Sequence, residues 1–166
     1  MSLAALTAAA VVATTPSPAR EPLDPLAFFE GSTRGVGTLQ VRGHSRQRFT
    51  VEGRGEREPG GAVRLSQAIR WEDGRVDRRV WRMWRVGPGE WRGRGTDMLG
   101  EGRAEAVGDT VVLTWRRAGG PFGRPLTVTQ VLRRRADGGL DNAGPVRLWG
   151  VTVARLEERI MRVEGP

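Results

Sequence analysis

The feature that most constrains this chain is an alternation of apolar and polar residues with a period of two. It is clearest in AVRLSQAIRW, where the large apolar residues between Val63 and Trp71 share one parity while arginine and serine take the other. Only a β-strand has this period, so one face of the segment is buried and the other is in water. Asp73-Gly74 follows at once, and Asp-Gly between two alternating runs predicts a tight hairpin.

Short alternating runs separated by Gly, Pro or Asp continue to the end of the chain. Counting the turns predicts roughly eight to ten short strands in one domain. Because the hairpins are consecutive and no long helical pattern intervenes, we expect an all-β, antiparallel up-and-down barrel over residues 23–166. Leu23 to Gly31 predicts one helical turn that caps the barrel mouth. The tail from Val151 to Val163 alternates at first and then, around LEERIMRV, also fits a short helix.

The run from Val76 to Val86 is ambiguous, because both of its parities mix apolar and charged residues. Either a bulge shifts the register or the outer face of this strand is partly covered. We expect Trp81 and Met83 to point inward and Trp84 to stack outward on neighbouring arginines. The aromatic residues then serve mainly the core, and the arginines mainly face solvent.

The basic charge does not indicate a nucleic-acid surface. The formal net charge is +8, but the chain has no Lys, and its 27 Arg residues are spread along the sequence among 19 acidic residues. A phosphate-binding patch would more commonly combine Arg with Lys. We therefore expect no specific nucleic-acid partner. The absence of Cys also excludes a disulfide and a Cys-ligated metal.

The best functional candidates are the inward apolar side chains. Small residues such as Gly93, Gly95 and Ala104 share the interior with large ones, which leaves two outcomes: a filled core, or a cavity that holds one small ligand. The predicted ligand-lining residues are Leu65, Ile69, Trp71, Trp81, Met83, Trp91 and Trp115.

The polar residues predict no catalytic, metal or cofactor site. His44 is the only histidine and lies in a turn, so it has no partner for a metal pair or a Ser-His triad. Turn chemistry and surface ion pairs account for Glu72, Asp73, Asp77 and Asp97. An enzyme on this fold would need an inward carboxylate beside a polar partner, and no position demands one.

The first 22 residues, MSLAALTAAAVVATTPSPAREP, predict a signal-peptide-like leader or a disordered start. The apolar run from Leu3 to Ala13 has the length of a signal-peptide core and is too short to span a bilayer. Small residues offer cleavage sites after Ala13 or Ala19, although no Lys or Arg precedes the apolar run. We expect export to the periplasm or cell envelope.

Four segments, LDPLAFFEGSTRGVG, DGRVDRRVWRM, GTDMLGEGRAEAVGDTVVLTW and LDNAGPVRLWGVTV, resemble in the same order an uncharacterised bacterial family of lipocalin-like envelope proteins, domain of unknown function 3833. The resemblance extends from Leu23 to Arg162. It implies a calycin-type barrel in the cell envelope and no established activity. Many members resemble lipoproteins with an acylated Cys; this chain has none, so a soluble periplasmic form is expected.

These observations predict that the chain is a non-enzymatic envelope protein. It would bind an apolar or amphiphilic small molecule, such as a lipid or fatty acid, inside the barrel. The alternative is a structural or accessory protein with a filled barrel, whose basic surface acts on an anionic membrane surface or on protein partners. The oligomeric state stays open.

Overall fold

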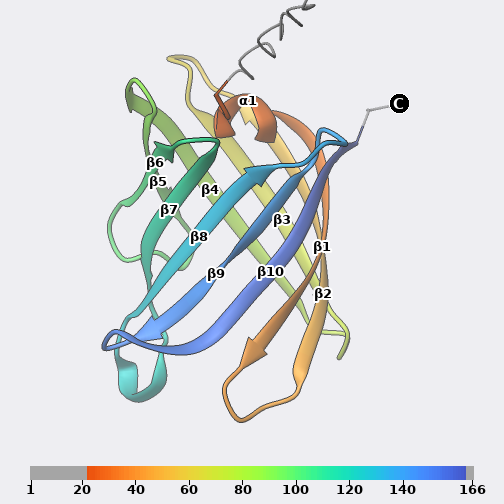
Figure 1. The fold of residues 1–166 in the computed structure, drawn as a ribbon, viewed down its shortest axis with the longest axis vertical. Helices are drawn as coiled ribbons and strands as arrows, with labels where there is room; N and C mark the ends of the chain where they lie inside the picture. The colour runs from red at the N-terminus through yellow and green to blue at the C-terminus, as the bar shows by residue number, and fades with distance from the viewer. Residues whose placement is uncertain (1–21, 164–166) are drawn as a thin grey trace, which may run out of the picture.

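Ten strands and one short α-helix make up residues 22–163, the part of the chain that this computed structural model describes (Figure 1). The helix α1 spans Pro25–Phe29, and a short 3-10 turn, η1, spans Pro121–Gly123. The strands are β1 (Gly31–Val41), β2 (Arg46–Arg57), β3 (Val63–Trp71), β4 (Val76–Gly87), β5 (Glu90–Gly95), β6 (Gly102–Val107), β7 (Thr110–Arg117), β8 (Leu126–Arg134), β9 (Leu140–Leu148) and β10 (Val151–Val163).

The strands form one closed antiparallel barrel. Each strand pairs with the next in sequence, and β1 closes the ring by pairing with β10. The predicted up-and-down barrel is therefore confirmed. Closure leaves no sheet edge free to pair with another chain.

Helix α1 covers one end of the barrel (Figure 1). The Asp24 carboxylate accepts a hydrogen bond from the Leu26 N–H at 3.0 Å, and Pro25 fits the first turn, so the helix begins at Pro25. Leu26, Phe28 and Phe29 are buried in the main core cluster. The short helix predicted at the barrel mouth is thus present, and it closes that end with apolar side chains.

The predicted hairpin at Asp73-Gly74 is present between β3 and β4. Gly74 has a φ of +86°, which favours glycine, and the Trp71 N–H donates to the Arg75 carbonyl at 2.9 Å. The alternative helix in the tail is wrong: β10 is a strand to Val163, because pairing with both β1 and β9 overrides the local helical pattern.

The register of β4 resolves the ambiguous run. Its pairing with β3 is continuous from Val76 to Met83, and the only shift lies at its far end, after Arg85. Trp81 and Met83 point inward as predicted, and the Arg82 guanidinium lies over the outward Trp84 ring. Unbroken alternation also carries two charged residues, Asp77 and Arg79, to the inner face.

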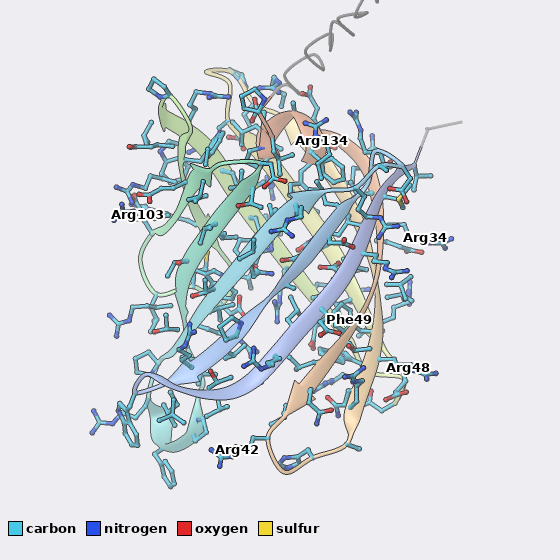
Figure 2. The ribbon with its side chains drawn as sticks, viewed as in Figure 1. Arg34, Arg42, Arg48, Phe49, Arg103 and Arg134 are labelled. Carbon is cyan, nitrogen blue, oxygen red and sulfur yellow. The ribbon has the colours of Figure 1, made fainter. Side chains whose placement is uncertain are left out.

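Most arginines still lie outside. Figure 2 shows Arg34, Arg48 and Arg103 pointing away from the barrel, while Phe49 lies within it and is buried. The predicted leader falls almost entirely on residues 1–21, outside the described residues. Within residues 22–163, no helix combines the length and the apolar character needed to cross a bilayer.

Candidate functional site

A cavity of about 120 Å³ lies inside the barrel. Six of the predicted ligand-lining residues border it: Leu65, Ile69, Trp71, Trp81, Met83 and Trp115. Trp91 instead borders a second, apolar cavity of about 50 Å³ beneath α1, together with Leu26 and Ala104. That these side chains contact a ligand stays a prediction. A larger hollow of about 330 Å³ lies on the outer wall, bordered by Arg133, Arg155 and Glu157. It is a surface depression that is open to solvent.

The interior is layered along the barrel axis. The α1 end is apolar, with Val63, Leu65 and Val111 in the main core cluster. The other end holds a second apolar cluster of Phe49, Val51 and Ile69, against which Trp71 packs. Between these two layers the cavity is bordered by five polar side chains, here called the polar belt: Gln67, Arg79, Gln130, Asn142 and Glu158.

Register brings the belt residues together. Glu158 on β10 lies directly opposite Asn142 on β9, and the Asn142 Nδ2 donates to the Glu158 Oε2 at 2.9 Å. Gln67 on β3 likewise lies opposite Arg79 on β4. The Glu158 carboxyl also rests against Gly35 on β1, where any side chain would overlap its Oε1. Glycine at this position therefore makes room for the carboxyl group.

Burial dominates the electrostatics of Glu158. Loss of water raises its pKa to about 7, against the opposing effects of the Asn142 hydrogen bond and the positive charge of Arg79. Glu158 keeps some accessible surface because it borders the cavity. A carboxyl group with this pKa is present in both the neutral and the charged form near neutral pH.

Arg79 brings a positive charge to the belt. Its Nη2 lies 3.5 Å from the Asp97 Oδ2, while the Asp97 carboxylate accepts a closer hydrogen bond, 2.8 Å, from Arg117. Burial lowers the pKa of Arg79, and the charge of Asp97 partly offsets that effect. Asp97 is thus shared between two arginines, which leaves guanidinium N–H groups of Arg79 available to an acceptor in the cavity.

Two buried polar atoms at the cavity lack a hydrogen-bond partner within residues 22–163. They are the Trp81 Nε1, a donor, and the Asn142 Oδ1, an acceptor. Trp115 differs, because its Nε1 donates to Gln130 at 3.3 Å. Unpaired buried polar atoms are costly and uncommon, so an unpaired donor and acceptor on one cavity match a ligand that carries both kinds of group.

The sequence did not predict the polar belt, and the expectation that no position demands an inward carboxylate is wrong. The signal was a polar residue between two apolar residues of the same parity. Glu158 stands between Leu156 and Ile160 in this way, and Gln67 stands between Leu65 and Ile69. Without the strand pairing, nothing indicated that these positions meet at one level.

Of the four acidic residues considered in the sequence, Asp73 serves its turn, while Glu72, Asp77 and Asp97 contact residues on other strands. The Glu72 carboxylate accepts from the Arg48 N–H at 3.0 Å, and Asp73 accepts from the N–H of Arg75 within the turn. Asp77 accepts from the Trp71 Nε1 at 2.8 Å. His44 is exposed. Within residues 22–163, no group of three His, Asp or Glu could hold a metal ion.

Comparisons with known proteins agree with the barrel. A family model described as "Protein of unknown function (DUF3833)" matches residues 3–162. Among curated proteins, no sequence matches the chain. A solved structure, the S-type phycobiliprotein lyase CPES from Guillardia theta, is similar with a TM-score of 0.64 and 9% sequence identity, covering 85% of this chain and 92% of the lyase. At that identity the similarity shows a shared lipocalin-like fold.

Proposed function

This chain belongs to the family described as Protein of unknown function (DUF3833), and we propose that it binds an amphiphilic small molecule inside its barrel. The observation that carries the proposal is the polar belt between two apolar layers of the interior. Burying Arg79 and Glu158 in a barrel core is costly, and a core built only for stability would be apolar. A ligand with a polar group gives the belt residues a partner.

The cavity volume limits what binds without rearrangement. About 120 Å³ is close to the roughly 150 Å³ of an engineered cavity that holds benzene, and it is below the roughly 300–1,000 Å³ of most ligand pockets. The proposal therefore predicts that the belt and cavity hold the polar group and the first carbons of a ligand. A longer chain, as in a fatty acid, would extend past Ile69 and Trp71 toward the end that α1 does not cover.

Fold-level analogy supports a small-molecule ligand. The similar barrel belongs to a phycobiliprotein lyase, and barrels of this kind are compatible with small-molecule binding. The ligand class is argued from the belt alone. We also propose that the protein acts in the periplasm or envelope, which the N-terminal sequence of the mature protein would test.

The test is a tryptophan-fluorescence titration. Trp81 and Trp115 pack edge to face with 5.1 Å between ring centres and both border the cavity, so a ligand there should change their emission. We expect a saturable change with oleic acid, with oleoyl lysophosphatidylglycerol or with dodecanol, a series that varies the head group on an apolar chain.

A matched pair of variants locates the site. Arg79→Met removes the inward charge at similar length, and Arg78→Met makes the same change on the adjacent outward residue. We expect binding at least tenfold weaker in Arg79→Met, with Arg79→Lys intermediate and Arg78→Met like the wild type. No saturable change with any of the three compounds, or equal affinity of the two Met variants, would contradict the proposal and favour the filled barrel.

A further inference from the structure

Two large aromatic side chains stand in water at the barrel end opposite α1. Phe122 is 89% exposed in the connection between β7 and β8, and Trp149 is 72% exposed in the turn between β9 and β10. Figure 1 shows both connections together at the lower left of the barrel, while α1 lies at the top. Most other tryptophans, by contrast, pack against the interior, so exposure of these two residues requires its own explanation.

The backbone at both residues makes their exposure more unusual. Phe122 has a φ of +57° and Trp149 a φ of +51°, and they are the only non-glycine residues among 22–163 with positive φ. Each is followed by a glycine that also has positive φ, Gly123 and Gly150. A two-residue hairpin turn with this backbone is best served by Asn-Gly. Trp-Gly is less stable in this turn than Asn-Gly. This indicates that the exposed Trp149 indole has a role other than stabilising the turn.

The two segments that carry the aromatics are basic, although Asp97 of the neighbouring β5–β6 connection pairs with Arg117. Residues 116–125, which carry Phe122, include Arg124 and no acidic residue, and residues 142–156, which carry Trp149, include Arg147 and again no acidic residue. The β1–β2 loop reaches the same end, where Figure 2 shows Arg42. Val151, 55% exposed, adds apolar surface beside Trp149.

We propose that this end of the barrel docks on the surface of an anionic lipid bilayer. We call the surface the docking rim and define it as Phe122, Trp149, Arg42, Arg124 and Arg147. Tryptophan favours the interface between lipid headgroups and acyl chains, and arginines near a membrane are attracted to anionic headgroups.

The charge of the rim favours an anionic bilayer. The two aromatics protrude from separate connections, and the segments that carry them contain Arg124 and Arg147 and no acidic residue. Two protruding residues flanked by positive charge suit a planar, deformable, negatively charged surface. The proposal does not depend on a ligand inside the barrel, because none of the rim residues borders the interior cavity.

The test is binding of the protein to protein-free vesicles. We compare flotation with vesicles of phosphatidylcholine alone and of phosphatidylcholine with 30% phosphatidylglycerol. We expect binding to the anionic vesicles, a blue shift of the exposed Trp149 emission, and weakening by 0.5 M NaCl through screening. The double variant Phe122→Ser, Trp149→Ser should bind at least tenfold more weakly.

The control is a double variant that removes two exposed apolar residues elsewhere. Val36, 61% exposed on β1, and Val107, 57% exposed at the β6–β7 turn, are both changed to Ser and should leave binding unchanged. Phe122 and Trp149 are both exposed and have a strained backbone. The rim variant should therefore be at least as stable to unfolding as the wild type. Equal binding of the two double variants would overturn the proposal. No binding to either vesicle would also overturn it, and a protein partner would then fit the rim better.

Discussion

Substitution of Glu158 by Gln tests the electrostatics of the barrel interior. A pKa of about 7 in the folded protein, against an ordinary value of 4.5 in the unfolded chain, corresponds to about 3 kcal/mol of unfolding free energy, at about 1.4 kcal/mol for each tenfold change in proton affinity. Below pH 4.5 both states hold the proton. Between pH 4.5 and 7 only the folded state does, so stability falls as the pH rises and the loss is complete by about pH 8.

Glu158→Gln should abolish this dependence. The Gln side chain keeps an oxygen that accepts from Asn142 and still faces Gly35 and, across the interior, Arg79, but it carries no charge at any pH. We expect the variant to match the wild type near pH 4.5 and to exceed its unfolding free energy by about 3 kcal/mol at pH 8. Urea-induced unfolding followed by tryptophan fluorescence at intervals from pH 4.5 to 8 measures both curves.

The control is Glu157→Gln, one residue earlier on the same strand and on the outer face. The unfolding free energy of Glu157→Gln should decrease as the pH rises, as that of the wild type does. Glu30 and Asp137 do not disturb this window: hydrogen bonds from Arg57 and Arg135, respectively, lower their pKa values, so their contributions are lost only at lower pH. If Glu158→Gln and Glu157→Gln lose stability in parallel, Glu158 is not buried as described.

Three further predictions concern single side chains, each measured by urea unfolding. Gly55→Ala places a methyl group onto the backbone of helix α1 and should cost about 1–3 kcal/mol, whereas Gly87→Ala, with nothing nearer than 3.7 Å, should change stability by less than about 0.5 kcal/mol; similar losses would contradict the packing of α1. Trp149→Gly should stabilise the turn by about 1 kcal/mol while weakening vesicle binding; a less stable variant would show that the indole contributes to the fold. Asp77→Ala leaves the Trp71 indole N–H without its acceptor and should cost about 1–3 kcal/mol, and no loss would mean that water replaces the carboxylate.

The barrel was predictable from local patterns, because each hairpin pairs residues that are close in sequence. Alternation from Val63 to Trp71 and the turn at Asp73-Gly74 define β3 and the start of β4, and the other hairpins follow in the same way. The tail was not predictable, since LEERIMRV fits a helix and a strand about equally. What decides it is pairing with β1, which lies more than a hundred residues earlier.

The candidate site was only half predictable, for a related reason. Apolar lining residues such as Leu65 and Trp81 follow from parity alone. Arg79 shares the parity of Trp81, so parity alone also places Arg79 inside. A charged residue at an inward position, however, is equally well explained by a bulge as long as the register of the strand is unknown. Asn142 and Glu158 become a pair only when β9 is aligned with β10.

Closure of the ring through β1 and β10 has a consequence for how the protein is made. During translation β1 emerges first, yet one of its two neighbours is the last strand to be synthesised. Until then β1 keeps a row of unpaired N–H and C=O groups, which is an aggregation hazard for a nascent chain. The same adjacency brings Gly31 and Val163 to one end of the barrel. A circular permutant that links the end of β10 to the segment before α1 and opens the chain at Asp73-Gly74 would move the late pairing to the β3–β4 hairpin.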